Sequence, residues 1–110
     1  MPITYHLDRT PSPDEVIDLY RSAGLARPVD DRARIATLYQ HANLIASAWD
    51  GDTLVGVARS LTGFRWCCYL ADLAVRAEYQ HQHIGKRLVE LTRERVGDES
   101  TVMLLSVPTA

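Results

Sequence analysis

The sequence has 110 residues, of which 46% are hydrophobic and 24% are charged, with 12 Lys and Arg against 14 Asp and Glu. This length suits one domain with a core of its own and is too short for two independent domains. The formal charge of -2 lacks the basic surplus of a non-specific nucleic-acid binder. No apolar stretch approaches the ~20 residues of a membrane span, and the first nine residues lack the layout of a secretory signal. We therefore expect a cytoplasmic protein that binds neither nucleic acid nor membrane.

The first elements are a short strand and a helix. Residues 3–7 alternate apolar and polar side chains, which is typical of a strand. Ser12 can then cap a helix, Pro13 fits its first position, and Glu15 completes a capping box. Gly24 supplies the end of this helix.

A second helix and a hairpin are predicted next. Asp30 or Asp31 can cap the helix, and its apolar stripe has helical spacing. That stripe consists of Ile35, Leu38, Tyr39 and Ala42. The period then changes to that of strands over 44–49 and 54–61, which an Asp-Gly-Asp turn separates.

The last third of the chain is predicted as strand, loop, helix and strand. The long apolar run 66–75 is compatible with a central strand buried on both faces. A polar loop over 76–83 leads into a helix over 84–96, which Gly97 ends, and 102–107 form the final strand. A crossover of this kind is right-handed and joins parallel strands. The predicted order is β-α-α-β-β-β-α-β, an α+β or mixed α/β fold.

The loop between strand and helix is where we expect chemistry. Unpaired N–H groups at a helix N-terminus suit a phosphate or pyrophosphate. Gly85 would let the backbone approach such a ligand closely, and Lys86 adds a cation. The segment 76–95 carries five basic residues against three acidic ones. An ordinary amphipathic helix with a solvated basic face explains these features equally, because neither common glycine-rich phosphate motif is present.

A family resemblance bears on this choice. The segments Leu-Ala-Val at 73–75, Glu-Tyr-Gln at 78–80 and Ile-Gly-Lys-Arg-Leu at 84–88 resemble the signature Q/R-x-x-G-x-G/A of the GNAT superfamily of acyl-CoA-dependent N-acyltransferases. The order of elements is also similar, over about residues 2–108. The resemblance implies a single acyl-CoA-binding domain over 1–110. Its sheet would be mostly antiparallel, with one parallel strand pair, and flanked by helices.

The resemblance also implies the residues of a cofactor site. Acetyl-CoA would be the co-substrate, with its pyrophosphate on backbone amides of the loop and its pantetheine arm on main-chain groups at the end of the preceding strand. The motif strand and the next one, 66–75 and 102–107, would splay apart to make room. The implied cofactor-binding residues are Leu73, Val75, Gln80, His81, Gln82, His83, Ile84, Gly85 and Lys86.

Two departures from the family pattern matter. His83 replaces the first motif glycine, where a Cβ could crowd the pyrophosphate or redirect the loop, and a protonated imidazole could instead contact phosphate. Alternatively, His81 and His83 are exposed loop residues without a role. The family usually continues with another helix and two strands, whereas this sequence stops at Ala110. We expect a truncated form, a sheet that a partner chain completes, or a loss of catalysis.

Candidate catalytic groups lie on the motif strand. The resemblance places an oxyanion-stabilising amide at Val75. Asp72 is a carboxylate in an apolar run, where burial could raise its pKa and make it a general base. The alternative is a structural Asp satisfied by partners. Tyr69 lies on the same strand where some relatives carry a base, although the pattern favours a core tyrosine.

Other residues that often carry function are predicted to be structural. Cys67 and Cys68 are adjacent, so we expect two reduced thiols on a half-buried strand. Trp49 and Trp66 fit the packing of strands. No ligand set has metal-binding spacing, so no metal is expected.

The sequence thus predicts an N-acetyltransferase that moves an acetyl group from acetyl-CoA to a primary amine of a small molecule or peptide. The alternative is a non-catalytic CoA-binding or interaction module. An unpaired edge on the last strand, 102–107, would also favour a homodimer.

Overall fold

The structure is a computed structural model that describes residues 2–104. The helices and strands follow the predicted order, with one short 3-10 helix, η1, added before the last helix. In chain order they are β1 (Thr4–His6), α1 (Pro13–Ala23), α2 (Arg32–His41), β2 (Leu44–Asp50), β3 (Thr53–Thr62), β4 (Cys67–Val75), η1 (Ala77–Tyr79), α3 (Ile84–Val96) and β5 (Thr101–Met103). The predicted α+β class is confirmed.

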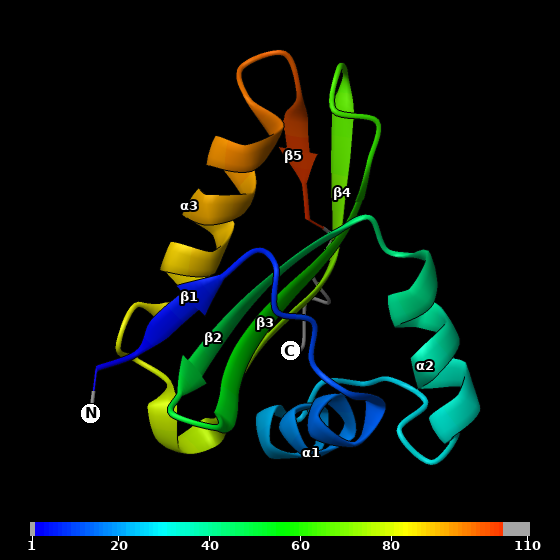
Figure 1. Ribbon diagram of the computed structural model, residues 1–110, viewed down its shortest axis with the longest axis vertical. Coiled ribbons are helices and arrows are strands. Elements are labelled where there is room, and N and C mark those ends of the chain that lie inside the picture. Colours follow the sequence, from blue (N-terminus) through cyan, green and yellow to red (C-terminus); the bar gives the residue numbers. More distant parts are fainter. Residues whose placement is uncertain (1, 105–110) are drawn as a thin grey trace.

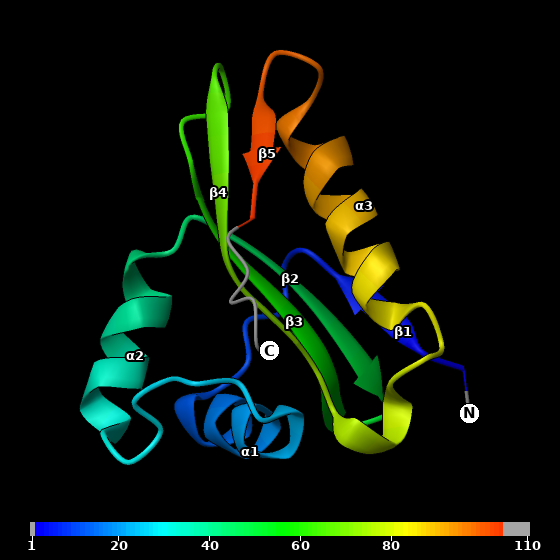
Figure 2. The ribbon, with the colours of Figure 1, turned by 180° about the vertical axis from the view of Figure 1, so that it is seen from behind.

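The strands of the described chain form one mixed sheet in the order β1-β2-β3-β4-β5. The first three pairings are antiparallel, and β4 and β5 are parallel, as predicted. Figures 1 and 2 show α1 and α2 beside one face of this sheet and α3 against the other. No helix within residues 2–104 is both long enough and apolar enough to span a membrane.

Local sequence signals set the ends of the first two helices. The Ser12 hydroxyl accepts a hydrogen bond from the Glu15 amide at 3.2 Å, and the Glu15 carboxylate accepts one from the Ser12 amide at 2.9 Å. This reciprocal pair satisfies two N–H groups that a helix otherwise leaves unpaired. Gly24 closes the helix in the left-handed conformation, at φ 71°. Asp31 caps α2 by accepting a bond from the amide of Arg34 at 3.1 Å.

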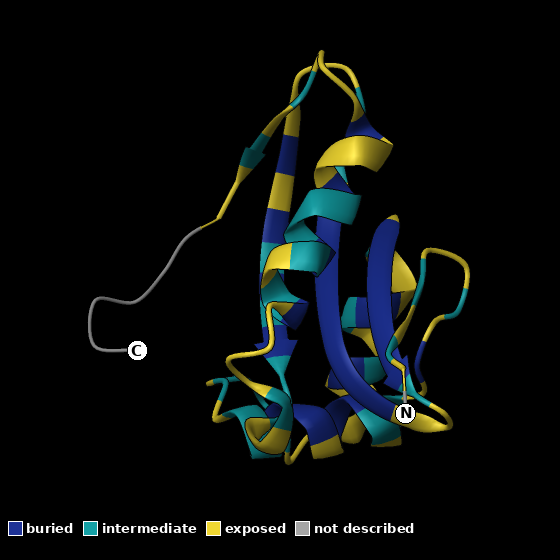
Figure 3. Cartoon of the chain, turned by 90° about the vertical axis from the view of Figure 1, so that its left-hand side faces the viewer, coloured by how far each residue is buried: buried dark blue, intermediate teal, exposed yellow. Residues whose placement is uncertain are grey.

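Two larger clusters of buried side chains, and a smaller third one with Leu44, Cys68 and Val96, fill the faces of the sheet. One of the two larger clusters lies beneath α1 and α2 and includes Leu19, Tyr20 and Ile35, and the other lies beneath α3 and includes Ile84 and Leu88. The strands between them, β2 and β3, are buried along most of their length, and Figure 3 shows them dark blue.

Close packing of α3 depends on a glycine in β3. A Cβ on Gly56 would lie 3.0 Å from Cδ1 of Leu88 and 3.1 Å from Cγ2 of Ile84, which is tighter than ordinary van der Waals contact. Glycine at this position lets the first two turns of α3 rest directly on the strand.

The prediction that 66–75 form a strand buried on both faces is wrong. Burial alternates along β4, whereas β2 and β3 are buried along most of their length. Trp66 precedes β4 and is 84% exposed, so its predicted packing is also wrong, whereas Trp49 is 2% exposed as expected. Cys67 is exposed, Cys68 is buried, and both are free thiols, as predicted.

The last strand pairs with only part of β4. Residues Thr101–Met103 lie opposite Cys67–Tyr69. Beyond Tyr69, no strand of the described chain pairs with this edge of β4. The predicted strand 102–107 lies partly outside the described residues, since these end at 104.

Candidate functional site

The site lies where β4 ends and α3 begins, at a free edge of the sheet. The Arg76 amide donates to the Val55 carbonyl of β3 at 2.8 Å. Successive peptide groups of a strand point to opposite edges. The N–H of Val75, and that of Leu73 two residues earlier, therefore point away from β3 and toward the edge that β5 does not reach.

Side-chain contacts hold the loop after β4 in place. Gln80 donates through Nε2 to the Val75 carbonyl at 3.0 Å. The Tyr79 hydroxyl donates to Oδ2 of Asp50 at 2.6 Å, which anchors η1 to the end of β2. Arg76 donates from Nε and Nη2 to the Leu54 carbonyl at 3.0 and 2.9 Å. These contacts thus attach the loop to β2, β3 and β4.

Two histidines of this loop have left-handed backbone conformations. His81 has φ 66° and His83 has φ 65°. A side chain in this region meets its own backbone at a cost that glycine avoids, although His adopts it more often than most residues. His83 is also the residue that precedes α3, at the position of the first motif glycine. The backbone conformation explains why a glycine suits this position.

A cavity of about 480 Å³ opens between β4, the loop and α3. Six of the nine predicted cofactor-binding residues line it. These are Val75, Gln80, His81, His83, Ile84 and Gly85, and Tyr79 completes the wall. Leu73 instead packs among the side chains beneath α3, and Gln82 is exposed. Lys86 lines a separate hollow of about 300 Å³ with His83, Arg87 and Glu90.

Glycine at 85 is not required by packing inside the protein. A Cβ there would meet only Cγ2 of Val75 within 4 Å, at an ordinary 3.6 Å. The missing side chain instead keeps the cavity open at the N-terminus of α3. This observation favours a ligand-related reason for the glycine over an internal packing reason.

The charges at the start of α3 suit an anion. The first turn of α1 carries Asp14 and Glu15, the usual complement to the positive end of a helix dipole. The first turn of α3 has no acidic residue, and Lys86 and Arg87 lie near its start. These cations are repelled by the positive end of the helix dipole. A bound anion would offset both positive charges and stabilise this end of the helix.

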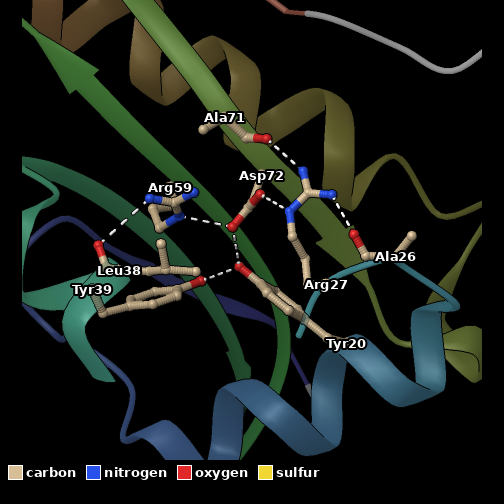
Figure 4. Close-up of polar contacts among 8 residues, drawn as sticks. All are labelled: Tyr20, Ala26, Arg27, Leu38, Tyr39, Arg59, Ala71 and Asp72. Carbon is tan, nitrogen blue, oxygen red and sulfur yellow. Dashed lines mark hydrogen bonds and ion pairs between the residues drawn. The ribbon is translucent and has the colours of Figure 1, made fainter. Parts of the chain in front are cut away.

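Asp72 is the centre of a buried ionic network (Figure 4). Its Oδ1 accepts from Nε of Arg27 at 2.5 Å, and its Oδ2 accepts from Nε of Arg59 at 2.7 Å and from the Tyr20 hydroxyl at 2.8 Å. Desolvation by burial alone would raise the pKa of Asp72, but these contacts outweigh it and hold the pKa below its usual value. The predicted raised pKa is therefore wrong, and the alternative of a structural Asp satisfied by partners is confirmed.

The partners of Asp72 were not predicted from the sequence. Tyr39 belongs to the apolar stripe of the second predicted helix, which indicates burial but not the partner of a hydroxyl, and Tyr20 lies within the first predicted helix. Their hydroxyl oxygens lie 2.5 Å apart. Burial raises the pKa of both tyrosines. Arg59, 8% exposed within an apolar strand, was the one available signal, because a buried arginine requires a carboxylate.

Tyr69 lies on the same side of the sheet as Asp72 and lines a second cavity with it, of about 320 Å³. Residues three apart normally face opposite sides of a strand. The register shifts here, since Asp72 pairs with Arg59 and Leu70 pairs with Ser60, so that Ala71 is an unpaired bulge. Tyr69 is 37% exposed, and the expectation of a core tyrosine is wrong.

No cluster of three or more potential metal ligands occurs among the described residues.

Comparison with known proteins assigns the fold. A model of the acetyltransferase (GNAT) family matches residues 6–108. A search of curated proteins finds no match. Among solved structures, a probable acetyltransferase from methicillin-resistant Staphylococcus aureus is 21% identical with a TM-score of 0.85, over 96% of this chain and 80% of that one.

Two further structures are similar. A GNAT family protein from Streptococcus pneumoniae is 24% identical with a TM-score of 0.81, over 97% of this chain and 77% of that one. The PaiA N-acetyltransferase from Thermoplasma acidophilum, solved with coenzyme A, is 16% identical with a TM-score of 0.69, over 87% of this chain and 72% of that one. At these identities the likeness concerns the fold.

Proposed function

This chain belongs to the GNAT acetyltransferase family, and on that premise we propose that it is an N-acetyltransferase. It would move an acetyl group from acetyl-CoA to a primary amine of a small molecule or peptide by direct attack. The observation that carries the proposal is the open cavity between the end of β4 and the N-terminus of α3. Support also comes from the Thermoplasma protein, whose structure contains coenzyme A.

Residues of the loop fit the phosphates of acetyl-CoA. The backbone amides over 81–86 include the unpaired N–H groups of the helix start, and Lys86 adds a positive charge. Gly85 keeps the approach to these amides open. The outward peptide groups of Leu73 and Val75 would bind the pantetheine arm as an added strand binds a sheet edge. When bound, acetyl-CoA supplies the thioester that the amine attacks.

The Val75 amide is our candidate for the oxyanion. Its N–H points to the free edge of β4, and the Gln80 side chain already occupies its carbonyl. A backbone N–H in this position can stabilise the charge that develops on the thioester oxygen during attack.

A proton must also leave the attacking ammonium. Asp72 is a poor candidate for its acceptor, because two guanidinium groups and a hydroxyl already occupy its oxygens. We assign Asp72 a positioning role toward Arg27 and Arg59. Tyr69 is the better candidate for proton transfer. It lines the second cavity, on the same face of the sheet as Asp72, and it is partly exposed.

One observation favours the alternative of a non-catalytic CoA-binding or interaction module. His83 places a side chain in the loop where the motif has glycine, and it lines the cavity itself. A binding module would show saturable acetyl-CoA binding without thiol release from any amine.

Calorimetric titration with acetyl-CoA, its dephospho form and acetyl-pantetheine tests the proposal. We expect saturable binding that weakens as phosphates are removed, and binding that is lost in Gly85→Trp, whose side chain would fill the cavity. The matched control is Gly63→Trp, because nothing lies within 4 Å of a Cβ at Gly63. A free-thiol assay with an amine panel follows. Equal binding of all three compounds would contradict the assignment of the loop.

We also propose that the protein forms a homodimer. β5 is the last strand of the described sheet, so one of its edges is unpaired there. Three large apolar residues near this edge, in sequence or in register, are exposed. They are Trp66 (84% exposed), Met103 (46%) and Leu104 (49%). Large exposed apolar side chains beside an open edge favour pairing with a second copy.

A further inference from the structure

The second cavity lies on the opposite face of the sheet from α3, between the α1–α2 loop, α2, β3 and β4. Its walls combine three arginines, one carboxylate and apolar side chains. They are Arg27, Pro28, Arg34, Leu38, Arg59, Leu61, Tyr69, Ala71 and Asp72. Three positive groups against one negative group leave this cavity with a cationic lining.

The one carboxylate of the lining has little capacity left for a ligand. Both oxygens of Asp72 accept hydrogen bonds from within the protein, and Asp72 is 1% exposed. Arg27 is likewise engaged, since it donates to Asp72 and, from Nη1 and Nη2, to the carbonyls of Ala26 and Ala71. The free capacity of the cavity therefore lies with the other two arginines.

Arg59 has donors that the protein does not use. Its side chain is 9% exposed and lines the cavity. Nε binds Asp72, and Nη1 reaches the Leu38 carbonyl only at 3.5 Å. Nη2 has no partner within the described chain, and Figure 4 shows this end of the guanidinium without a further dashed line. The buried side-chain atoms that lack a partner among the described residues are Ser60 Oγ and Ser100 Oγ, so Nη2 of Arg59 is not one of them. A charged donor that lines a cavity and is not used by the protein can donate to an anionic ligand there.

Arg34 supplies a second cation at the rim. It is exposed on α2, lines the same cavity, and makes no ion pair with the described residues. Arginine side chains bind carboxylate and phosphate groups through paired hydrogen bonds, whereas they repel ammonium groups. Leu38, Leu61 and Tyr69 offer apolar contact beside them.

We infer that the acceptor is an amine that also carries an oxyanion, a carboxylate or a phosphate, bound in this cavity by Arg59 and Arg34. The inference rests on the proposed acetyltransferase function and specifies its substrate class. The apolar walls would hold the carbon skeleton, and the amine would face the free edge of β4.

Matched acceptor pairs test the inference in a free-thiol assay with acetyl-CoA. The anionic acceptors are L-phenylalanine, 6-aminohexanoate and O-phosphoethanolamine, and the neutral partners are L-phenylalaninamide, hexylamine and ethanolamine. We expect at least one anionic acceptor to exceed its partner by about tenfold in kcat/KM, the effect of one charged hydrogen-bonded pair. The first two pairs report on carboxylate and the third on phosphate.

Variants separate this binding from general effects. Arg34→Gln should lower kcat/KM for the preferred anionic acceptor by about fivefold, mainly through KM, and leave the KM for acetyl-CoA unchanged. The matched control is Arg93→Gln, an exposed arginine on α3 on the other face of the sheet. Both positions are exposed, so neither change should prevent folding.

The outcomes distinguish the two proposals. Thiol release with neutral amines that equal or exceed their anionic partners overturns the inference and leaves the proposed function standing. If no acceptor releases thiol, the function fails, and the inference is then decided by NMR titration with N-acetyl-L-phenylalanine and N-acetyl-L-phenylalaninamide. Equal shifts for these two ligands, or none, overturn it.

Discussion

The side-chain amide of Gln80 donates to the carbonyl of Val75 at 3.0 Å, so the first residue of the motif holds the last residue of β4. At the free edge of the sheet, Val75 thus has its carbonyl oxygen occupied within the protein and its N–H directed outward. The contact gives Gln80 a role that does not require it to touch the cofactor.

Removing this contact should loosen the cofactor loop. Gln80→Ala is expected to weaken acetyl-CoA binding by about fivefold, which corresponds to one hydrogen bond of about 1 kcal/mol. Calorimetry measures the change. The matched control is Gln40→Ala, an exposed glutamine on α2, and equal affinity in the two variants would contradict the expectation.

His83→Gly should make the protein more stable. Relief of the left-handed backbone at φ 65° favours the folded state, while the freer unfolded chain of glycine offsets part of the gain. We expect the free energy of unfolding to rise by up to about 1 kcal/mol. Urea denaturation measures it. Gln82→Gly, at a neighbouring position without a positive φ, should instead lower stability, and equal losses in both variants would refute the strain.

Gly56→Ala should lower stability because α3 has no room to accept a methyl group. The new Cβ would lie 3.0 Å from Leu88 and 3.1 Å from Ile84. Overpacking of this kind costs about 1–3 kcal/mol. Gly63→Ala is the matched control, since a Cβ there meets nothing within 4 Å. Thermal unfolding of both variants checks the prediction, which fails if they melt together.

Acid should weaken the Asp72 network. The folded pKa of Asp72 lies below its ordinary value of 3.8, so the carboxylate stabilises the folded state above that pH. This contribution is lost as pH falls below 3.8 and through the folded pKa.

Asp72→Asn should remove this acid-dependent loss and cost about 3 kcal/mol at pH 7, because it leaves two guanidinium groups without a counter-charge. Chemical denaturation between pH 3 and 7 measures both effects. Asp14→Asn breaks an exposed pair with Arg32 and should change stability little. An unchanged pH profile in Asp72→Asn would exclude Asp72 as the source.

Replacement of an exposed apolar residue should shift the proposed homodimer toward monomer. Trp66→Ser removes a side chain that is 84% exposed beside β4. Light scattering over a range of concentrations should show a dimer mass for the parent chain and a lower mean mass for the variant. A monomer mass for the parent chain at every concentration would contradict self-association.

Signals that act over a few residues were readable from the sequence. The capping box of Ser12 and Glu15 and the left-handed Gly24 each depend on near neighbours, and they set the ends of α1 as predicted. The candidate cofactor loop was predicted in the same way, because its motif is continuous. Six of the nine predicted cofactor-binding residues line one cavity, while their binding of a cofactor stays a prediction.

Features that depend on distant residues were not readable. Asp72 meets Arg27 and Tyr20 only because the fold brings α1 and β4 together, and no local pattern indicates these partners. Burial of β4 was misjudged for a similar reason. An apolar run shows that a strand can be buried, whereas which of its residues the helices cover is a property of the whole fold, and the exposed residues of β4 are Cys67 and Tyr69 at its start.

The bulge at Ala71 divides β4 into two functional halves. On either side of the bulge, side chains alternate between the two faces of the sheet with a period of two residues. The extra residue shifts this alternation by one position, so that Tyr69 and Asp72 share a face. Deleting one residue there would keep the strand and its direction but exchange the faces of its first half. The acceptor cavity would then lose its tyrosine to the α3 side, while the cofactor loop, which follows the second half, would stay in place.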